Sequence, residues 1–130
     1  MLEVIREELV NSRAALESLG KTYLPVGKEK YWFVKTCNKI SKAIKRESKL
    51  VNVESNRLVK ELGTMQPNNQ VGIDRNNMEV MEQYSNAMQE FHDQKVIVDV
   101  EPLTLTQLKD LQVTLQVADQ MALSWLLKEV

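Results

Sequence analysis

The spacing of apolar residues predicts that most of this chain is helical. A first helix is expected over residues 2–19, because apolar side chains recur there at three- and four-residue steps and share one face. These side chains are Leu2, Ile5, Leu9, Leu16 and Leu19, with Ser12 as a polar exception. Gly20 is a stop signal and Pro25 forbids continuation, so a turn is expected over residues 21–27.

A second, longer helix is expected over residues 28–62, which contain no Gly or Pro before Gly63 ends the segment. Glu47 interrupts its apolar seam. The seam consists of Phe33, Cys37, Ile40, Ile44, Val51, Leu58 and Leu62. A helix of this length measures roughly 50 Å, so it is expected to pack against the first helix along one part and against later elements along another. A kink near residues 50–53 is an alternative, because this stretch is rich in weak helix formers.

The second half of the chain is expected to begin with a loop, a helix and a strand. Residues 63–77 are rich in turn formers, with 70–73 as a very short strand, and a third helix follows over 77–92. β-branched residues predict a strand over 95–100, which Pro102 limits. Since one strand cannot stand alone, its partner is the 70–73 segment, a second chain or another part of a larger assembly.

The C-terminal residues are expected to be helical again. A short helical turn is expected over residues 106–111. Thr114 is a suitable N-cap for a final helix that runs to Lys128. That helix is apolar on nearly every side, so it is expected to be buried or to dock on another surface.

The predicted fold is mainly α (α+β), in a single domain that covers residues 1–130. An N-terminal antiparallel helical hairpin with a long second helix occupies residues 2–62, and the loop follows over 63–77. Residues 78–130 form a helix–strand–helix part, which supplies two later helices and a minimal β element. A mass of 15.0 kDa and a content of only four Gly and three Pro agree with one helix-rich domain.

Composition narrows the classes of function. One cysteine excludes an internal disulfide, and one cysteine with one histidine leaves too few ligands for a structural zinc site. The longest uncharged apolar run, residues 121–127, is far too short to cross a membrane. The chain contains no phosphate-binding glycine loop, nucleophile-elbow motif or metalloprotease motif. We therefore expect no enzyme activity, no cofactor, no metal and no membrane partner.

Charge is unevenly distributed, although the net charge is only −1. Residues 21–60 hold eleven basic and three acidic side chains, whereas residues 61–130 hold four basic and eleven acidic ones. Six cations form a stripe on the second helix, opposite its apolar seam. They are Lys28, Lys35, Lys39, Lys42, Arg46 and Lys49. Such a stripe is a solvated face, a surface for an acidic protein or a row that tracks phosphates.

Aromatic, thiol and imidazole groups add little chemistry. In the triplet of residues 31–33, Phe33 belongs to the seam, so Tyr31 or Trp32 is expected to be partly exposed, as interface residues often are. Cys37 lies on the seam and is expected to be a buried structural thiol. His92 is expected at the end of the third helix, where it could contact the last carbonyls. Asp99 and Glu101 alternate along the strand and are expected to share a solvated face.

Short motifs in a fixed order resemble a known family. They are Ala14-Ala15-Leu16, Leu24-Pro25, the run from Glu54 to Gly63, the segment from Val96 to Leu103, and Val113-Thr114. In this order the chain resembles a family of small proteins of unknown function that phages and prophages of Gram-positive bacteria encode. The resemblance implies a phage gene product made in a bacterial cytoplasm, and it transfers no catalytic residue. Residues 64–77 depart from the family in being rich in Asn and Gln.

These observations lead to an expected binding function. We expect a phage-encoded, non-enzymatic protein that engages a host protein as an inhibitor or adaptor, for example in counter-defence. One alternative is a virion or assembly component, such as a connector, tail accessory protein or chaperone; another is a nucleic-acid-binding accessory protein that uses the basic helix face. A lone strand and an apolar last helix also favour a homo-oligomer. The expected partner-binding residues are Tyr31, Trp32 and the six cations of the stripe.

Overall fold

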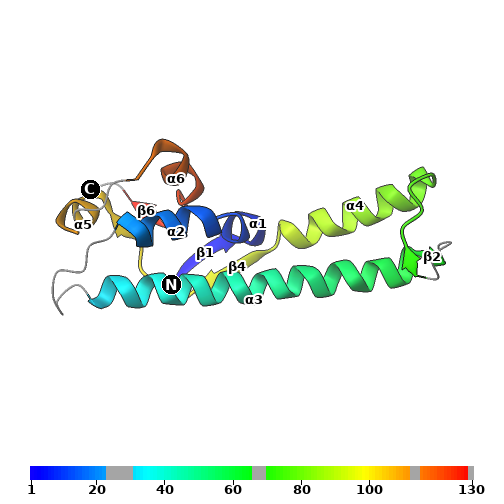
Figure 1. The fold of residues 1–130 in the computed structure, drawn as a ribbon, viewed down its shortest axis with the longest axis horizontal. Helices are drawn as coiled ribbons and strands as arrows, with labels where there is room; N and C mark the ends of the chain where they lie inside the picture. Colours follow the sequence, from blue (N-terminus) through cyan, green and yellow to red (C-terminus); the bar gives the residue numbers. More distant parts are fainter. Residues whose placement is uncertain (23–30, 66–69, 112–114, 129–130) are drawn as a thin grey trace.

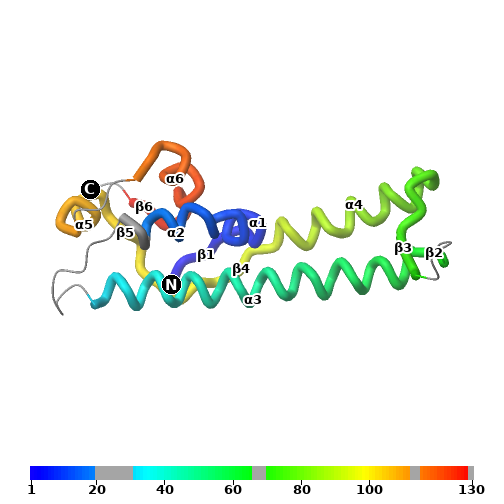
Figure 2. The backbone as a smooth tube through the Cα atoms, in the orientation of Figure 1, coloured from blue at the N-terminus to red at the C-terminus, as the bar shows by residue number. Residues whose placement is uncertain are grey.

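A long helix, α3, runs the length of the molecule and carries everything else on one side (Figure 1). The computed structural model describes residues 1–22, 31–65, 70–111 and 115–128. Helix α3 spans Tyr31–Leu62, 32 residues and about 48 Å. Its backbone continues unbroken through residues 50–53 (Figure 2), so the alternative of a kink there is wrong. The predicted start, residues 28–30, lies outside the described residues.

The N-terminal segment differs from the predicted helix. It forms strand β1 (Leu2–Ile5), helix α1 (Arg6–Val10) and helix α2 (Arg13–Thr22), and Gly20 lies inside α2 rather than ending it. β1 pairs antiparallel with β4 (Lys95–Val98), with Leu2 opposite Val98 and Ile5 opposite Lys95. Pairing with a β-branched strand far along the chain thus overrides the local helical period. It also corrects the predicted partner of that strand within the chain, since β4 pairs with β1 rather than with residues 70–73.

Helix α4 (Met78–His92) lies antiparallel to the distal half of α3 and forms with it an arm, defined as residues 48–92. The Asn77 side chain caps α4 by accepting a hydrogen bond from the Val80 amide at 3.2 Å, so the predicted helix is confirmed. The Tyr84 hydroxyl and the Ser55 hydroxyl are 2.7 Å apart and join the two helices. No residue of α4 is fully buried, because α3 covers one side of it and α1 contacts only its C-terminal end, beside Phe91.

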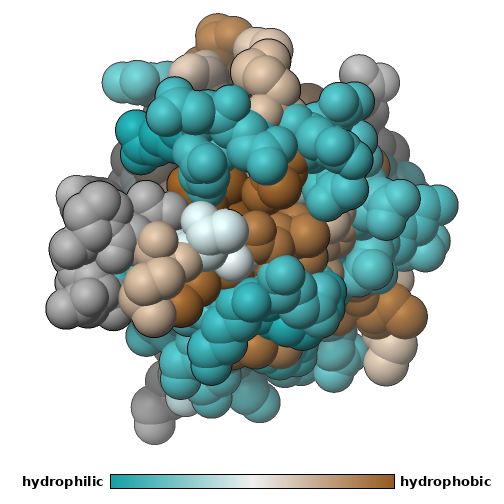
Figure 3. All heavy atoms as spheres, turned by 90° about the vertical axis from the view of Figure 1, so that its right-hand side faces the viewer, coloured by the Kyte–Doolittle hydropathy of each residue, from teal (hydrophilic) through white to brown (hydrophobic). Residues whose placement is uncertain are grey.

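A two-stranded turn closes the tip of the arm. β2 (Thr64–Met65) and β3 (Val71–Gly72) pair antiparallel, so the predicted short strand is present but its partner is β2. Gly63 stands between α3 and β2, where a Cβ atom would overlap the carbonyl oxygen of Val59 and lie 2.9 Å from that of Gly72. A glycine is therefore needed at this corner. Viewed from the arm end, apolar side chains show in the middle with polar side chains around them (Figure 3).

The C-terminal segment also differs from the prediction. It forms β5 (Leu103–Thr104), α5 (Leu105–Asp110), α6 (Val117–Ala122) and β6 (Leu127–Lys128), so the last helix ends six residues before the predicted limit. β6 pairs parallel with β5, and the fully buried Leu123 and Leu126 enter the core from turns rather than from a helix. Gln116 occupies the N-cap position of α6 without a side-chain capping hydrogen bond, and the predicted cap Thr114 lies outside the described residues.

The hydrophobic core lies in the head, which we define as β1, α1, α2, the proximal half of α3, β4 and the C-terminal elements. Its buried side chains come from β1, α1, α2, the proximal half of α3, β4, β5, α5 and the turns between α6 and β6. They include Leu9, Leu19, Phe33, Ile40, Ile44, Val98, Leu103, Leu123 and Leu126. Beyond Glu47 in α3, by contrast, only Leu58 is buried. The long helix therefore packs against different elements along its two halves, as its length predicted.

A buried ion pair joins the head to the arm. Arg6 and Glu47 are 7% and 4% exposed, and the Arg6 Nε donates to Glu47 Oε2 at 3.0 Å. Arg6 Nη1 also donates to the Phe91 carbonyl and to Gln94 Oε1, both at 2.7 Å, and the guanidinium lies 3.9 Å from the centroid of the Phe91 ring. Glu47, which interrupts the apolar seam, thus has a charged partner from another element.

A second polar contact holds the C-terminal segment to the N-terminal helices. Ser12 is fully buried at the break between α1 and α2. Its hydroxyl oxygen accepts a hydrogen bond from Trp125 Nε1 at 2.8 Å and lies 2.6 Å from the Glu8 carbonyl oxygen. The polar exception in the first apolar pattern is therefore the point at which the last segment attaches.

Replacing Arg6 is expected to destabilise the protein more than replacing an arginine on the arm surface. Arg6→Ala leaves the buried Glu47 carboxylate unpaired, so the free energy of unfolding should fall by roughly 3–5 kcal/mol in urea denaturation. Arg57→Ala, which removes exposed ion pairs with Glu54 and Glu61, is the control and should change the midpoint little.

The double variant Arg6→Met/Glu47→Leu separates burial of a charge from loss of packing. It removes both charges together, so its stability should recover toward that of the natural chain. A double variant as unstable as Arg6→Ala would show that the unpaired carboxylate is not the cause.

Candidate functional site

The structure places the predicted partner-binding residues along the exposed side of α3. Lys35, Lys39, Lys42, Arg46 and Lys49 are all exposed, whereas Lys28 lies outside the described residues. Tyr31 and Trp32 are 62% and 38% exposed, and Phe33 is buried, as the sequence indicated. The structure does not gather all of these residues into one site, because only some of them face another element.

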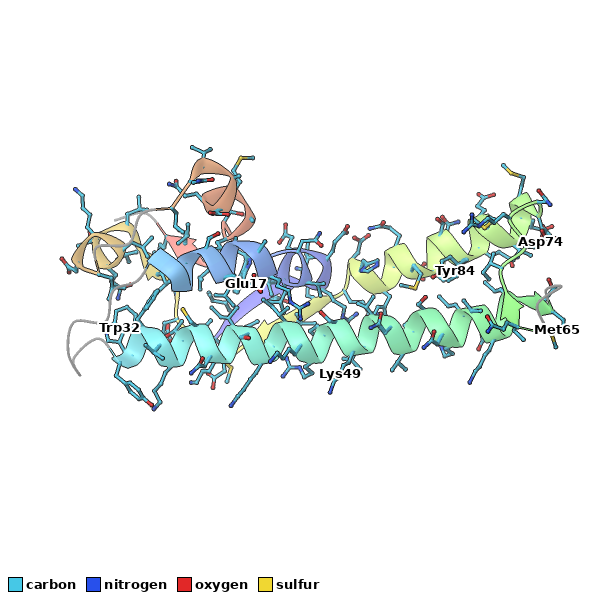
Figure 4. The ribbon with its side chains drawn as sticks, viewed as in Figure 1. Glu17, Trp32, Lys49, Met65, Asp74 and Tyr84 are labelled. Atoms are coloured by element: carbon cyan, nitrogen blue, oxygen red, sulfur yellow. The ribbon has the colours of Figure 1, made fainter. Side chains whose placement is uncertain are left out.

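A cleft of about 430 Å³ lies between the head end of α3 and the segment that connects β4 to α5. Trp32, Lys35, Thr36 and Lys39 form its α3 wall. The opposite wall consists of residues 99–103 and Gln107. Trp32 lies at the head end of the long helix (Figure 4). The cleft therefore joins one aromatic and two basic residues of the prediction to residues some 65 positions later in the chain.

Backbone and capping contacts fix the wall opposite Trp32. The Val100 amide donates to the Val98 carbonyl at 2.9 Å, and the Leu103 amide donates to the Leu126 carbonyl at 2.8 Å. Val100 and Leu103 are buried and give the cleft an apolar base. A reciprocal capping box between Thr104 and Gln107 starts α5 at once and holds Gln107 at the cleft.

The Trp32 ring packs against the core and stays partly exposed. It meets the buried Phe33 ring edge to face, with centroids 6.0 Å apart and an interplanar angle of 83°. The Thr36 hydroxyl donates to the Trp32 carbonyl at 3.0 Å within the helix. Trp32 is thus a preordered aromatic wall with free surface, which is typical of residues that dominate protein interfaces.

The rim of the cleft carries charges of both signs. Lys39 Nζ lies 3.8 Å from Asp99 Oδ2, and both side chains are more than half exposed. Lys35 and Glu101 are exposed beside them. Asp99 and Glu101 are therefore solvated as predicted and form one edge of the cleft, but they lie beyond β4, which ends at Val98 rather than at the predicted residue 100. An apolar base, an aromatic wall and a mixed-charge rim suit the binding of a side chain and its neighbours.

The other cations of the stripe lie beyond the cleft. Lys42, Arg46 and Lys49 line a shallow groove of about 410 Å³ with Leu50 and with Lys45, which the sequence placed outside the stripe. Arg46 Nε donates to Glu47 Oε1 at 3.2 Å. Within the described residues, Lys42, Lys45 and Lys49 take part in no ion pair. The groove is therefore a strongly positive surface, separate from the cleft with its mixed charges.

The thiol and imidazole groups lie away from the cleft. Partial burial raises the pKa of the Cys37 thiol to about 11, so it is protonated at neutral pH. His92 is the last residue of α4, but the Asp93 amide caps the helix end, and the buried His92 Nδ1 has no hydrogen-bond partner among the described residues. Across the ranges that the structure describes, no cluster of three His, Cys, Asp or Glu could hold a metal ion.

Sequence reasoning missed half of the cleft. Val100, Leu103 and Gln107 lie across it from Trp32, and the sequence assigned them no role in a site. Of the same wall it singled out Asp99 and Glu101, as a solvated face, and Pro102, as a limit to strand pairing. A capping-box pattern at Thr104 and Gln107 was a local signal for a helix start there. No local signal links residues 32 and 102, because their proximity depends on the pairing of β1 with β4 and of β5 with β6.

Cys37 is expected to react slowly with thiol reagents in the folded protein. With a pKa raised to about 11, the thiolate is present below about pH 10 only as a minor species, so the rate should keep rising with pH through that range. The measurement is the rate of maleimide labelling by mass spectrometry, with the guanidinium-unfolded chain as the fast-reacting control. Rapid labelling of the folded chain at pH 7 would contradict this assignment.

Comparison with known proteins adds no relative to these observations. None of the described helices is long and apolar enough to cross a membrane. No protein family model, no curated protein and no solved structure matches the chain.

Proposed function

We propose that this chain is a non-enzymatic binding protein that engages another protein through the cleft beside Trp32. The observation that carries the proposal is a half-exposed tryptophan that forms one wall of a cleft of about 430 Å³ with an apolar base. Tyr31, exposed one residue earlier, extends the aromatic surface. Such an aromatic, held by the core and ringed by polar groups, has the properties of an interface hot spot.

The charges at the rim favour a protein over a nucleic acid at this cleft. Lys35 and Lys39 alone would attract phosphates, but Asp99 and Glu101 stand opposite them. A phosphate backbone in the cleft would meet these carboxylates, whereas a protein surface can offer charges of both signs. The nucleic-acid alternative therefore receives no support from the cleft.

The sequence resemblance supports a proposal for where the protein acts and which class of partner it binds. A small protein encoded by a phage of a Gram-positive host would act in the host bacterial cytoplasm, and its partner would be a host protein that it inhibits or recruits. A component of the virion or of its assembly is the alternative partner class. Mass spectrometry of purified virions separates the two, since an assembly component that stays in the particle must be found there.

Replacing Trp32 with Ala is expected to abolish or weaken binding of the partner protein. Immobilised protein is used to capture binders from host lysate, and the captured proteins are compared between the natural chain and Trp32→Ala. Because Trp32 is a wall of the cleft, a partner that binds there should be lost or reduced at least tenfold. Lys39→Glu, which changes the rim but not the aromatic wall, should weaken the same partner.

Met121→Ala is the matched control, since Met121 is an exposed apolar residue on α6 and does not line the cleft. Circular dichroism and urea denaturation establish that all three variants fold. A partner retained equally by Trp32→Ala and Met121→Ala would show that the cleft is not the binding site.

A further inference from the structure

The proposed function leaves unused the positive groove on α3, which is lined by Lys42, Lys45, Arg46, Lys49 and Leu50. Its four cations are exposed, and in the part of the chain that the structure describes the three lysines form no ion pair. Arg46 Nε donates to Glu47, but the Arg46 side chain is still 58% exposed. Lysine and arginine side chains only donate hydrogen bonds, so the groove presents donors and positive charge without a side-chain acceptor.

No carboxylate of α3 shares the face that carries this groove. Residues 31–53 contain one acidic residue, Glu47, which is 4% exposed and bonds to the buried Arg6. The exposed pair of Lys39 and Asp99 marks the head end of the groove. The groove is therefore positive throughout, whereas the rim of the cleft carries both signs. A surface of one sign suits a partner that is uniformly negative.

The acidic half of the chain does not oppose an anion at the groove. The exposed glutamates of α4 are Glu79, Glu82 and Glu90. At 100° per residue they lie roughly 120° or more around α4 from Tyr84, whose hydroxyl contacts Ser55 of α3. They therefore face away from α3, and Lys49 points away from α4 (Figure 4). Because the two charged faces lie on opposite sides of the arm, the net charge of −1 does not remove the positive potential at the groove.

The shape of α3 at the groove fits a rod-shaped polyanion. Lys45 and Arg46 lie roughly 100° apart around the helix, with Lys42 and Lys49 between them, and the four extend over about 10 Å along its axis. The rest of the fold lies on the other side of α3, so the groove is open along the helix (Figure 1). A helix with its side chains is about 10–12 Å across and the major groove of B-DNA is about 12 Å wide. Cations on both flanks of α3 can therefore reach phosphates at both edges of a DNA groove.

We infer that the positive groove of α3 binds the phosphate backbone of duplex DNA, as a second binding function beside that of the cleft. Contacts from lysine and arginine to phosphates carry no sequence information, so the binding is independent of sequence. Residues 34–62 of α3 contain no aromatic side chain on which the bases of a single strand could stack. The major groove of duplex RNA is too narrow for side chains to enter, which favours DNA.

The DNA contact is separate from the cleft of the proposed function. None of the residues that line the positive groove lines the cleft beside Trp32. Trp32→Ala is therefore expected to leave DNA binding unchanged, and failure of either proposal does not imply failure of the other.

Fluorescence anisotropy with a short labelled DNA duplex of mixed sequence tests the inference. Four phosphate contacts predict that a fourfold rise in salt concentration weakens binding roughly 150-fold. The variant Lys42→Gln/Lys45→Gln/Lys49→Gln keeps Arg46, which contacts Glu47. At low salt it should bind at least about tenfold more weakly than the natural chain, and the same rise in salt should weaken its binding only about three- to fourfold.

The matched control is Arg75→Gln/Lys109→Gln/Lys128→Gln, which removes the same charge at exposed positions outside the groove. It should bind the duplex as the natural chain does, with the same dependence on salt. Circular dichroism establishes that both triple variants keep the helical content of the natural chain. A duplex of a different sequence should bind equally well, because the contacts are to phosphates.

Four results would overturn the inference. The first is a natural chain that does not bind the duplex at low salt, and the second is a Lys-to-Gln variant that binds as the control does. The third is equal or tighter binding of single-stranded DNA or duplex RNA of the same length. The fourth is equal or tighter binding of poly-glutamate, which would assign the groove to an acidic protein instead.

Discussion

The buried ion pair between Arg6 and Glu47 connects α3, the C-terminal end of α4 and the residue that precedes β4. The guanidinium bonds to α3 through Glu47, to the end of α4 through the Phe91 carbonyl, and to Gln94 just before β4. Both charges are almost fully buried, so each needs the other. The β1–β4 pairing begins beside this contact, since the Arg6 amide donates to the Gln94 carbonyl at 2.8 Å. Displacing Arg6 would therefore disturb the strand pair, the arm and the first helices together.

The cleft and the arm depend on this junction in different ways. The cleft lies in the head, where β4 leads directly into the wall opposite Trp32, so the position of that wall follows from the β1–β4 register. Beyond Glu47, α3 has only one buried residue, and α4 has none. Its geometry depends on the junction at one end, the Ser55–Tyr84 contact along it and the Gly63 corner at the other. Glu79, Glu82 and Glu90 of α4 are therefore left exposed.

The fold places the positive and negative segments of the sequence on different surfaces. The positive segment becomes the outer side of α3, and part of the negative segment becomes the outer side of α4. Both helices turn their charged faces outward. The positive and negative side chains that cancel in the net charge therefore lie on different surfaces instead of pairing with each other. Lys35 and Lys39 line the cleft, and Lys42, Lys45 and Lys49 line the shallow groove farther along α3.

The sequence alone determined the features that local physics controls. The period of apolar residues and the absence of Gly and Pro determined α3, and the apolar residues within 77–92 determined α4. Consecutive helix positions determined that Phe33 is buried while Tyr31 or Trp32 is exposed. Only the tertiary structure decided that residues 2–5 form a strand, that Glu47 is paired, and that residues 99–107 face Trp32. These features depend on contacts between residues 40 to 95 positions apart, whose energy exceeds local propensity and leaves no periodic signal in the sequence.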